Sequence, residues 1–135
     1  MIVEGTLSCI DNFNELSKEH WSEFNTQEPS FNLYYLKNLH AILYKDNGVT
    51  QGYLFYLMFP SPYYKELNCQ VDMFFLRKKY RGQKIGKRMF NKMEEKAKEA
   101  GCSRILSSYN NKLPLDGFYA SMGYTSTHTA VMKEI

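Results

Sequence analysis

The chain has 135 residues, of which 44% are hydrophobic, 16% aromatic and 23% charged, and its net charge is +3. This balance is typical of a globular protein of ordinary domain size, so we expect residues 1–135 to form a single domain. No apolar run approaches the ~20 residues that a membrane-spanning helix needs. The first residues also lack the basic segment and apolar core of a signal peptide. The sequence therefore predicts neither a membrane partner nor a secretory signal.

Cysteine and histidine usage excludes two further kinds of protein. The three cysteines, Cys9, Cys69 and Cys102, are far apart and form no C-x-x-C pair. Their number and spacing exclude a disulfide scaffold and a zinc site built from cysteine pairs, and they favour a reducing, cytoplasmic location. The three histidines have no metal-ligand spacing, so we expect no metal site.

Basic residues are concentrated in one segment. Residues 77–92 contain eight basic side chains and no acidic one, whereas the rest of the chain carries nine basic and 14 acidic side chains, a net charge of −5. A local field of one sign suggests an anionic partner, although a solvated face of a surface helix is the alternative. Gly82 and Gly86 favour a ligand, because glycine lets a backbone approach a ligand closely.

The N-terminal part predicts a strand, a helix and a loop. Residues 2–8 form a short strand, and residues 27–31 form a loop. Residues 34–38 are ambiguous and are compatible with one helical turn. A helix should begin after Asp11 or Asn12, either of which can cap it. The helical spacing of apolar and aromatic side chains defines the buried face of this helix, which consists of Phe13, Leu16, His20, Trp21 and Phe24.

A β-hairpin is predicted next. Two apolar runs, residues 39–44 and 49–59, flank Asn47-Gly48, and Asn-Gly between apolar runs is a strong hairpin signal. Pro60 ends the second strand, because proline cannot donate a hydrogen bond to the sheet.

The C-terminal half alternates strands and helices. Residues 69–76 predict a mostly buried strand, residues 85–100 an amphipathic helix and residues 104–108 another strand. A short helix follows over residues 114–122, and one or two strands over residues 124–135. The order predicts a mixed α/β fold with a central parallel β-α-β unit.

The glycine-containing turn before the long helix can bind phosphate, because the first amides of a helix lack partners within it. Two common phosphate-binding motifs do not fit. A Walker A loop has four residues between its first glycine and its Gly-Lys pair, and Ser or Thr follows the lysine. Here three residues separate Gly82 from Gly86, and Arg88 follows Lys87. The dinucleotide fingerprint needs a second glycine where Lys84 stands.

The segment Tyr80 to Lys87 (YRGQKIGK) resembles the acyl-CoA signature of the GNAT superfamily of N-acyltransferases. That signature has Arg or Gln, two residues, Gly, one residue, and then Gly or Ala. Arg81 and Gly86 match its first and last positions, and Lys84 replaces its middle glycine. The resemblance implies a mainly antiparallel sheet around the parallel unit.

Two further segments support this resemblance. Residues 117–124 (GFYASMGY) are similar to the family's Phe-Tyr-x-x-x-Gly-Phe helix and turn. Residues 60–65 (PSPYYK) are similar to small acetyltransferase-like proteins of tailed phages. Together these segments extend the resemblance over most of the chain from residue 39.

The resemblance implies that acetyl-CoA is the cofactor. The backbone of residues 74–76 would pair with the pantetheine arm, and the amides of residues 82–87 would hold the pyrophosphate. Lys84, Lys87 and Arg88 would add positive charge there, and Asn110 or Asn111 would contact the cofactor. The cofactor-binding residues implied by the resemblance are Phe74, Phe75, Leu76, Arg81, Gly82, Gln83, Lys84, Ile85, Gly86, Lys87, Arg88 and Asn111.

Two residues are candidates for proton transfer. Asp72 is the only acid in the strand over residues 69–76, and an attacking amine benefits from a general base. A structural Asp, or a chain of waters acting as the base, is the alternative. By resemblance, Tyr119 would donate a proton to the leaving thiolate, the alternative being a core tyrosine.

The leading hypothesis is an N-acetyltransferase whose partners are acyl-CoA and an amine acceptor, with direct attack in a ternary complex. A nucleic-acid-binding module that uses residues 77–92 is one alternative, and a GNAT-like domain that binds CoA or a protein without catalysis is another. A homodimer is a further assembly that the sequence leaves open. Aromatic side chains that either line an acceptor groove or pack in the core are Trp21, Tyr34, Tyr35, Tyr63 and Tyr64.

Overall fold

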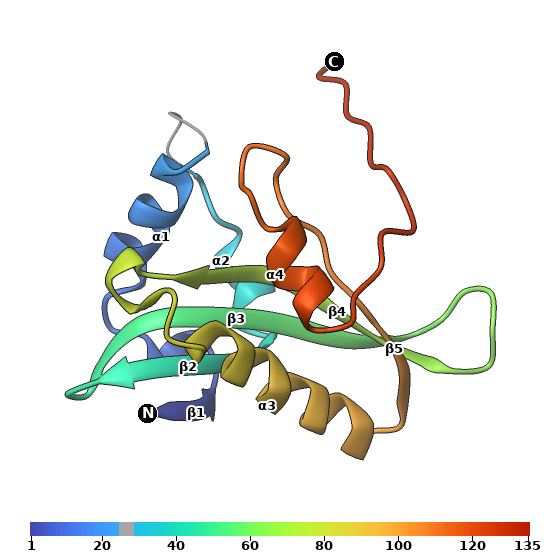
Figure 1. Ribbon diagram of the computed structural model, residues 1–135, viewed down its shortest axis with the longest axis horizontal. Helices are drawn as coiled ribbons and strands as arrows, with labels where there is room; N and C mark the ends of the chain where they lie inside the picture. The colour runs from blue at the N-terminus through green and yellow to red at the C-terminus, as the bar shows by residue number, and fades with distance from the viewer. Residues whose placement is uncertain (25–28) are drawn as a thin grey trace.

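The computed structural model describes residues 1–24 and 29–135. Within them a five-stranded sheet has the order β1-β2-β3-β4-β5, and Figure 1 shows helices on both of its faces. Of the loop predicted over residues 27–31, residues 27 and 28 lie outside the described part, and residues 29–31 form no helix or strand. The strands are β1 (Ile2–Gly5), β2 (His40–Asp46), β3 (Val49–Pro60), β4 (Leu67–Leu76) and β5 (Cys102–Leu106).

The described helices confirm the predicted mixed α/β fold. The long amphipathic helix and the short helix near the C-terminus both form where the sequence predicts them, and the ambiguous residues 34–38 include one helical turn. The α-helices are α1 (Phe13–Ser22), α2 (Leu33–Leu36), α3 (Ile85–Glu99) and α4 (Asp116–Ser121). Two 3-10 turns, η1 (Leu7–Cys9) and η2 (Lys78–Tyr80), complete the described helical segments.

The predicted hairpin is confirmed, with β2 and β3 pairing antiparallel across a two-residue turn. Asn47 and Gly48 have φ angles of 51° and 77°, the left-handed conformation that a tight hairpin turn needs at both positions. The first strand is shorter than predicted. It ends at Gly5 because residues 7–9 turn into η1.

The parallel β-α-β unit is also confirmed, since β4 and β5 pair in parallel and α3 connects them. β4 contains an irregularity. Phe55 pairs with Met73 and Tyr56 with Val71, so Asp72 is the extra residue of a β-bulge. A bulge bends a strand and redirects its side chains.

Two hydrophobic cores lie on opposite faces of the sheet. On one face α3 packs Met89, Phe90 and Met93 against the strands. On the other face α1 and α2 supply Phe13 and Leu36 among other residues. The sheet is therefore the middle layer of three (Figure 1).

The prediction of strands over residues 124–135 is wrong. After α4 the described chain forms no strand, and residues 125–135 are exposed and extend away from the sheet (Figure 1). The threonines and Val131 favour extended backbone, but strand propensity stabilises a strand only where side chains pack against neighbouring strands. Val131 and Met132 have no such contact and are 93% and 87% exposed.

Candidate functional site

An open strand edge lies at the centre of the candidate site. β5 pairs with β4 only from Leu67–Cys102 to Gln70–Leu106, whereas β4 continues to Leu76. Within the described residues, positions 71–76 of β4 have no strand partner on this side. Unpaired backbone groups at a strand edge can accept an added strand.

The loop that follows β4 presents unpaired N–H groups. Among residues 1–24 and 29–135, no acceptor is recorded for the backbone N–H of any residue from 82 to 87, while the next amide, that of Arg88, donates to the Lys84 carbonyl at 3.1 Å. Residues 82–84 are exposed, and α3 begins with no side-chain cap and no acid in its first turn. The arrangement can bind an anion through main-chain donors and the positive end of the helix dipole.

Lys84 has the backbone conformation of a glycine. Its φ is 65°, and that of Gly82 is 78°. A left-handed conformation strains a residue such as lysine by about 1–2 kcal/mol. The loop therefore keeps a glycine-like turn although lysine replaces the middle glycine of the signature.

Gly86 allows the first turn of α3 to pack closely against two aromatic rings. A Cβ at this position would lie 3.2 Å from Phe74 Cζ and 3.3 Å from Phe118 Cε2. The two rings are stacked, with centroids 5.6 Å apart and an interplanar angle of 7°. Glycine thus lets α3, β4 and α4 meet at one point beside the open edge.

Asp72 lies in the β4 bulge and faces α2. The Tyr35 hydroxyl donates a hydrogen bond to Asp72 Oδ1 at 3.3 Å. Partial desolvation raises the pKa of Asp72, and the Tyr35 hydrogen bond opposes that rise. Among the described residues, Asp72 forms no ion pair with Arg or Lys.

Tyr119 projects from α4 to the end of β5. Its hydroxyl lies 2.7 Å from Ser107 Oγ, and its ring stacks on Tyr109 at 5.3 Å. Burial raises the pKa of Tyr119, and the hydrogen bond with Ser107 lowers it. The phenol is therefore protonated at neutral pH and can donate a proton or a hydrogen bond.

The basic segment divides into two groups. Arg77 pairs with Glu15 and Glu19, and Arg81 pairs with Glu23. Lys92 lies near Glu4 and Glu95. Among the described residues, the basic side chains of this segment that form no ion pair are Lys78, Lys79, Lys84, Lys87 and Arg88. Of these five, Lys84 precedes α3, and Lys87 and Arg88 lie in its first turn.

Sequence reasoning did not identify the acidic stripe of α1. Glu15, Glu19 and Glu23 recur every four residues and therefore share one face of the helix. Arg77 and Arg81 are also four residues apart. The matched spacing could have predicted that part of the basic segment neutralises α1.

Other residues that the sequence singled out differ in their exposure. Asn111 is exposed in the turn before α4, and Asn110 Oδ1 accepts a hydrogen bond from the Lys112 N–H at 2.9 Å. Tyr34 and Tyr35 are exposed on α2, whereas Trp21 is half-buried against Phe24 and Phe31. Tyr63 and Tyr64 are exposed in the loop between β3 and β4.

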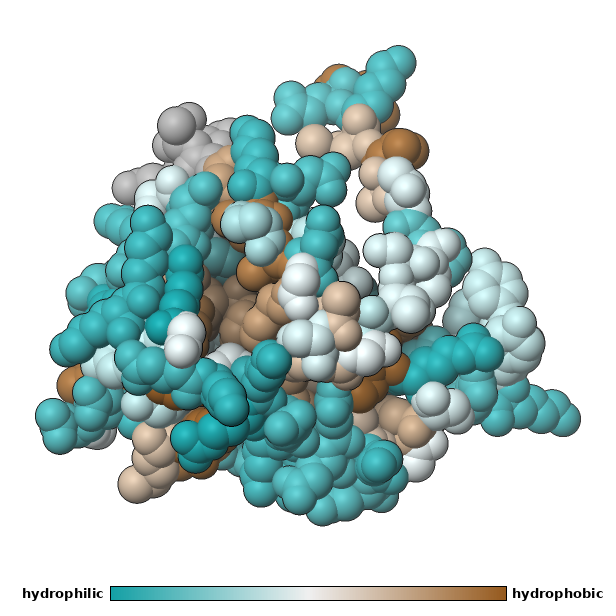
Figure 2. Space-filling view, in the orientation of Figure 1, coloured by the Kyte–Doolittle hydropathy of each residue, from teal (hydrophilic) through white to brown (hydrophobic). Residues whose placement is uncertain are grey.

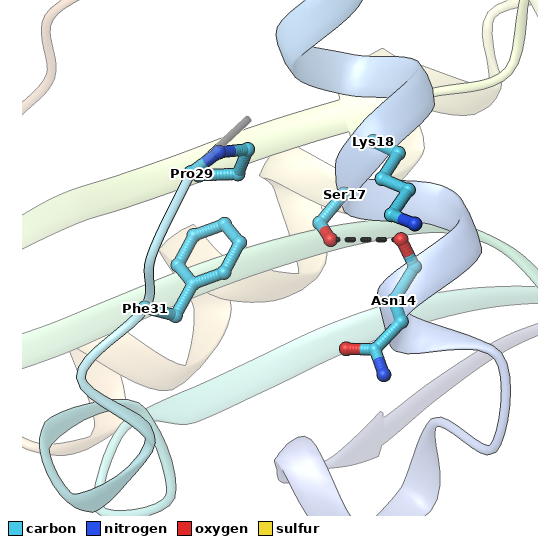
Figure 3. A pocket seen from close by; sticks show the side chains of 5 residues that line it. All are labelled: Asn14, Ser17, Lys18, Pro29 and Phe31. Atoms are coloured by element: carbon cyan, nitrogen blue, oxygen red, sulfur yellow. Dashed lines mark hydrogen bonds between the residues drawn. The ribbon is translucent and has the colours of Figure 1, made fainter. Parts of the chain in front are cut away.

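Two small hollows lie away from these residues. Figure 3 shows one of about 120 Å³ beside α1, where Ser17 Oγ donates to the Asn14 carbonyl at 3.1 Å. A second, of about 230 Å³, lies near the β2–β3 turn and includes Asn12 and Lys45. Neither contains a predicted site residue. Figure 2 shows hydrophobic side chains at the centre of the face that it draws, between hydrophilic ones.

Comparisons with known proteins agree with this fold. The family model described as acetyltransferase (GNAT) family matches residues 10–124. A comparison with curated proteins finds no match. Within the described residues, no helix is both long and apolar enough to cross a membrane.

Solved structures with the same fold have varied descriptions. A ribosomal-protein-alanine N-acetyltransferase from Brucella melitensis biovar Abortus is 18% identical, with a TM-score of 0.79 over 100% of this chain and 99% of the other. A transcriptional regulator from Bacillus halodurans is 20% identical, with a TM-score of 0.80 and coverage of 100% and 99%. An aminoglycoside acetyltransferase from an uncultured soil metagenomic sample is 14% identical, with a TM-score of 0.80 and coverage of 100% and 97%.

Proposed function

Because the chain belongs to the GNAT family of acetyltransferases, we propose that it transfers an acetyl group from acetyl-CoA to a primary amine by direct attack in a ternary complex. The observation that carries this proposal is the row of N–H groups at residues 82–87 that have no acceptor within the described part of the chain. A pyrophosphate needs several convergent donors, and a turn that enters a helix supplies them without ordering any long side chain.

The residues at this turn fit the anionic part of CoA. The N–H groups of residues 82–87 would hold the pyrophosphate, and Lys84, Lys87 and Arg88 would add charge around it. No acidic residue lies in the first turn of α3 to oppose an anion. Asn111, exposed before α4, is the candidate for a further polar contact.

The open edge of β4 fits the pantetheine arm. Its amide groups would pair with the backbone of residues 74–76 as an added strand does. The stacked rings of Phe74 and Phe118 form an apolar wall beside that edge. The ordering of these rings by packing limits the entropy lost on binding.

Asp72 and Tyr119 would handle the two protons of the reaction. When bound, acetyl-CoA supplies an activated acyl group as a thioester. Asp72 would accept a proton from the attacking amine, helped by a pKa raised through desolvation. Tyr119 would donate a proton to the leaving sulfur, and its raised pKa keeps that proton in place.

The acceptor would approach Asp72 from the side of α2. Tyr34 and Tyr35 are exposed there, and Tyr35 already contacts Asp72. The similar structures include a ribosomal-protein-alanine N-acetyltransferase and an aminoglycoside acetyltransferase. An acceptor panel should therefore contain both protein amines and small-molecule amines.

Calorimetry with acetyl-CoA tests the proposal. We expect micromolar binding, weakened about tenfold by Arg88→Ala through loss of one charge-assisted contact. Lys98→Ala is the matched control, since it removes a basic side chain near the other end of α3. Thiol release with an amine panel then separates an enzyme from a domain that binds CoA only. No binding by the wild-type protein at high micromolar acetyl-CoA would contradict the proposal.

A further inference from the structure

Arg81 has an unexpected set of contacts for the first residue of an acyl-CoA signature. Its Nε donates to the Leu76 carbonyl at 2.7 Å, and its Nη2 donates to both carboxylate oxygens of Glu23 at 2.7 and 2.9 Å. The guanidinium lies 5.6 Å from the centroid of the Phe75 ring. The Arg81 backbone N–H donates to the Lys78 carbonyl at 3.1 Å. The residue is therefore bonded to the protein rather than turned toward the loop.

Its partner Glu23 sits in a protected position at the end of α1. The Glu23 side chain is only 13% exposed, whereas Glu15 is 69% exposed. Charge-assisted hydrogen bonds are stronger where water is partly excluded. A single arginine thus joins the end of β4, the start of the loop and the C-terminal end of α1.

A second arginine reinforces the same connection. Arg77 Nε donates to Glu19 at 2.8 Å and its Nη2 donates to Glu15 at 2.8 Å. We use the term arginine clamp for Arg77 and Arg81 with their three glutamate partners. The clamp fastens one face of α1 to the segment that leads into the proposed pyrophosphate loop.

Arg81 would lose several bonds by turning to a phosphate. The bonds from Nη2 to the two Glu23 carboxylate oxygens and the bond from Nε to the Leu76 carbonyl would all break. Meanwhile Lys84, Lys87 and Arg88 have no ion pair among the described residues and lie nearer the N-terminus of α3. The arrangement of lower free energy keeps Arg81 in the clamp, and the other three residues neutralise the phosphates.

We infer that Arg81 is a positioning residue, an inference that rests on the proposed function. Arg81 couples CoA binding at residues 82–87 to α1, and its side chain does not bind the phosphates. Ordering the loop by CoA restrains Arg81 and, through Glu23, the end of α1. CoA binding would therefore make α1 less mobile before the acceptor reaches Asp72.

Hydrogen exchange with and without CoA tests this coupling. In the wild-type protein we expect CoA to slow exchange of the α1 amides, residues 13–22, by about threefold or more, as well as that of the loop. Arg81→Gln and Glu23→Gln should each abolish the α1 protection and keep the loop protection. Arg81→Lys should behave like Arg81→Gln, because a lysine cannot bridge Leu76 and Glu23 as the guanidinium does.

Calorimetry of the same variants separates positioning from direct binding. All three should bind acetyl-CoA within about threefold of wild type, with an unchanged salt dependence, while Arg88→Ala weakens binding about tenfold. A tenfold loss in Arg81→Gln that Arg81→Lys restores would overturn the inference, as would α1 protection that persists in the variants. CoA binding without α1 protection in wild type overturns the inference alone. Absence of CoA binding overturns the proposed function, and this inference with it.

Discussion

The hydroxyl of Tyr119 lies 2.7 Å from Ser107 Oγ, so the end of β5 holds the phenol of α4 in one orientation. Tyr119 is 7% exposed and its ring is fixed by Tyr109 on one side. A donor held in this way needs no reorganisation when charge develops on a nearby atom. The pair gives the proposed acid a defined position beside the open edge of β4.

Removing the Tyr119 hydroxyl should stop most turnover without loss of the cofactor. Tyr119→Phe should lower kcat about 100-fold, the usual contribution of a general acid, with little change in the Kd of acetyl-CoA. Ser107→Ala is the matched control, since it removes only the partner and should lower kcat less. Steady-state kinetics and calorimetry measure both effects. Full turnover in Tyr119→Phe would exclude Tyr119 as the acid.

Lys84→Gly should stabilise the protein. Its φ of 65° is strained for lysine and ordinary for glycine, and the relief exceeds the added entropy of the unfolded chain by about 0.5–1 kcal/mol. Urea unfolding should show the gain. Lys84→Ala, which removes the same charge but keeps a Cβ, should not show it. A Lys84→Gly protein no more stable than Lys84→Ala would mean that the turn carries no strain.

Asp72→Asn should raise the stability of the protein at pH 7 and lower its activity. Desolvation raises the pKa of Asp72 in the folded protein, so the folded state binds the proton more tightly than the unfolded state. The stabilisation is present at acid pH and is lost as pH rises through the folded pKa. At pH 7 the variant should therefore unfold at higher urea concentration than wild type, while its kcat falls about 100-fold.

Tyr35→Phe serves as the control for Asp72. The Tyr35 hydrogen bond lowers the pKa of Asp72, so its removal should move the acid limb of the kcat/KM profile to higher pH. Asp72→Asn should remove that limb instead. Identical pH profiles for wild type and Asp72→Asn would show that another group, or a water chain, accepts the proton.

His20 should make the protein sensitive to acid. Burial, with a smaller contribution from Arg81, lowers the pKa of His20 to about 4, and its Nδ1 lies 2.7 Å from the Tyr53 hydroxyl. Because the unfolded state takes up the proton near pH 6.5, stability is lost as pH falls from about 6.5 to 4, by roughly 3 kcal/mol. Urea unfolding across this range measures the loss.

His20→Gln should flatten that pH dependence, since glutamine does not titrate. His128→Gln, in the exposed C-terminal segment, should leave the dependence as in wild type. A steep loss of stability that survives in His20→Gln would assign the acid sensitivity to other groups.

Local sequence signals predicted those parts of the fold that depend on local chemistry. Asn47-Gly48 specified the hairpin because both residues accept positive φ. The apolar stripe of α3 specified the helix, and its place between two apolar strands specified the parallel unit. The strands predicted over residues 124–135 do not form, because a strand also needs a neighbouring strand to pair with and composition does not show whether one is present.

Contacts between distant residues could not be predicted in the same way. Arg81 and Glu23 are 58 positions apart, and only the packing of α1 on the sheet brings them together. The bulge at Asp72 likewise depends on the register between β3 and β4. Residue types at the candidate site were therefore identifiable from the sequence, while the division of the basic segment between α1 and the loop was not.

Backbone amide NMR during a titration with acetyl-CoA tests the central claim most directly. The claim is that the N–H groups of residues 82–87, which have no acceptor in the described structure, bind the pyrophosphate. The account predicts that these six amides show the largest shifts and that 3′-dephospho-CoA, which keeps the pyrophosphate, reproduces them. Saturating acetyl-CoA with unshifted amides at residues 82–87, or with the largest shifts elsewhere, would contradict it.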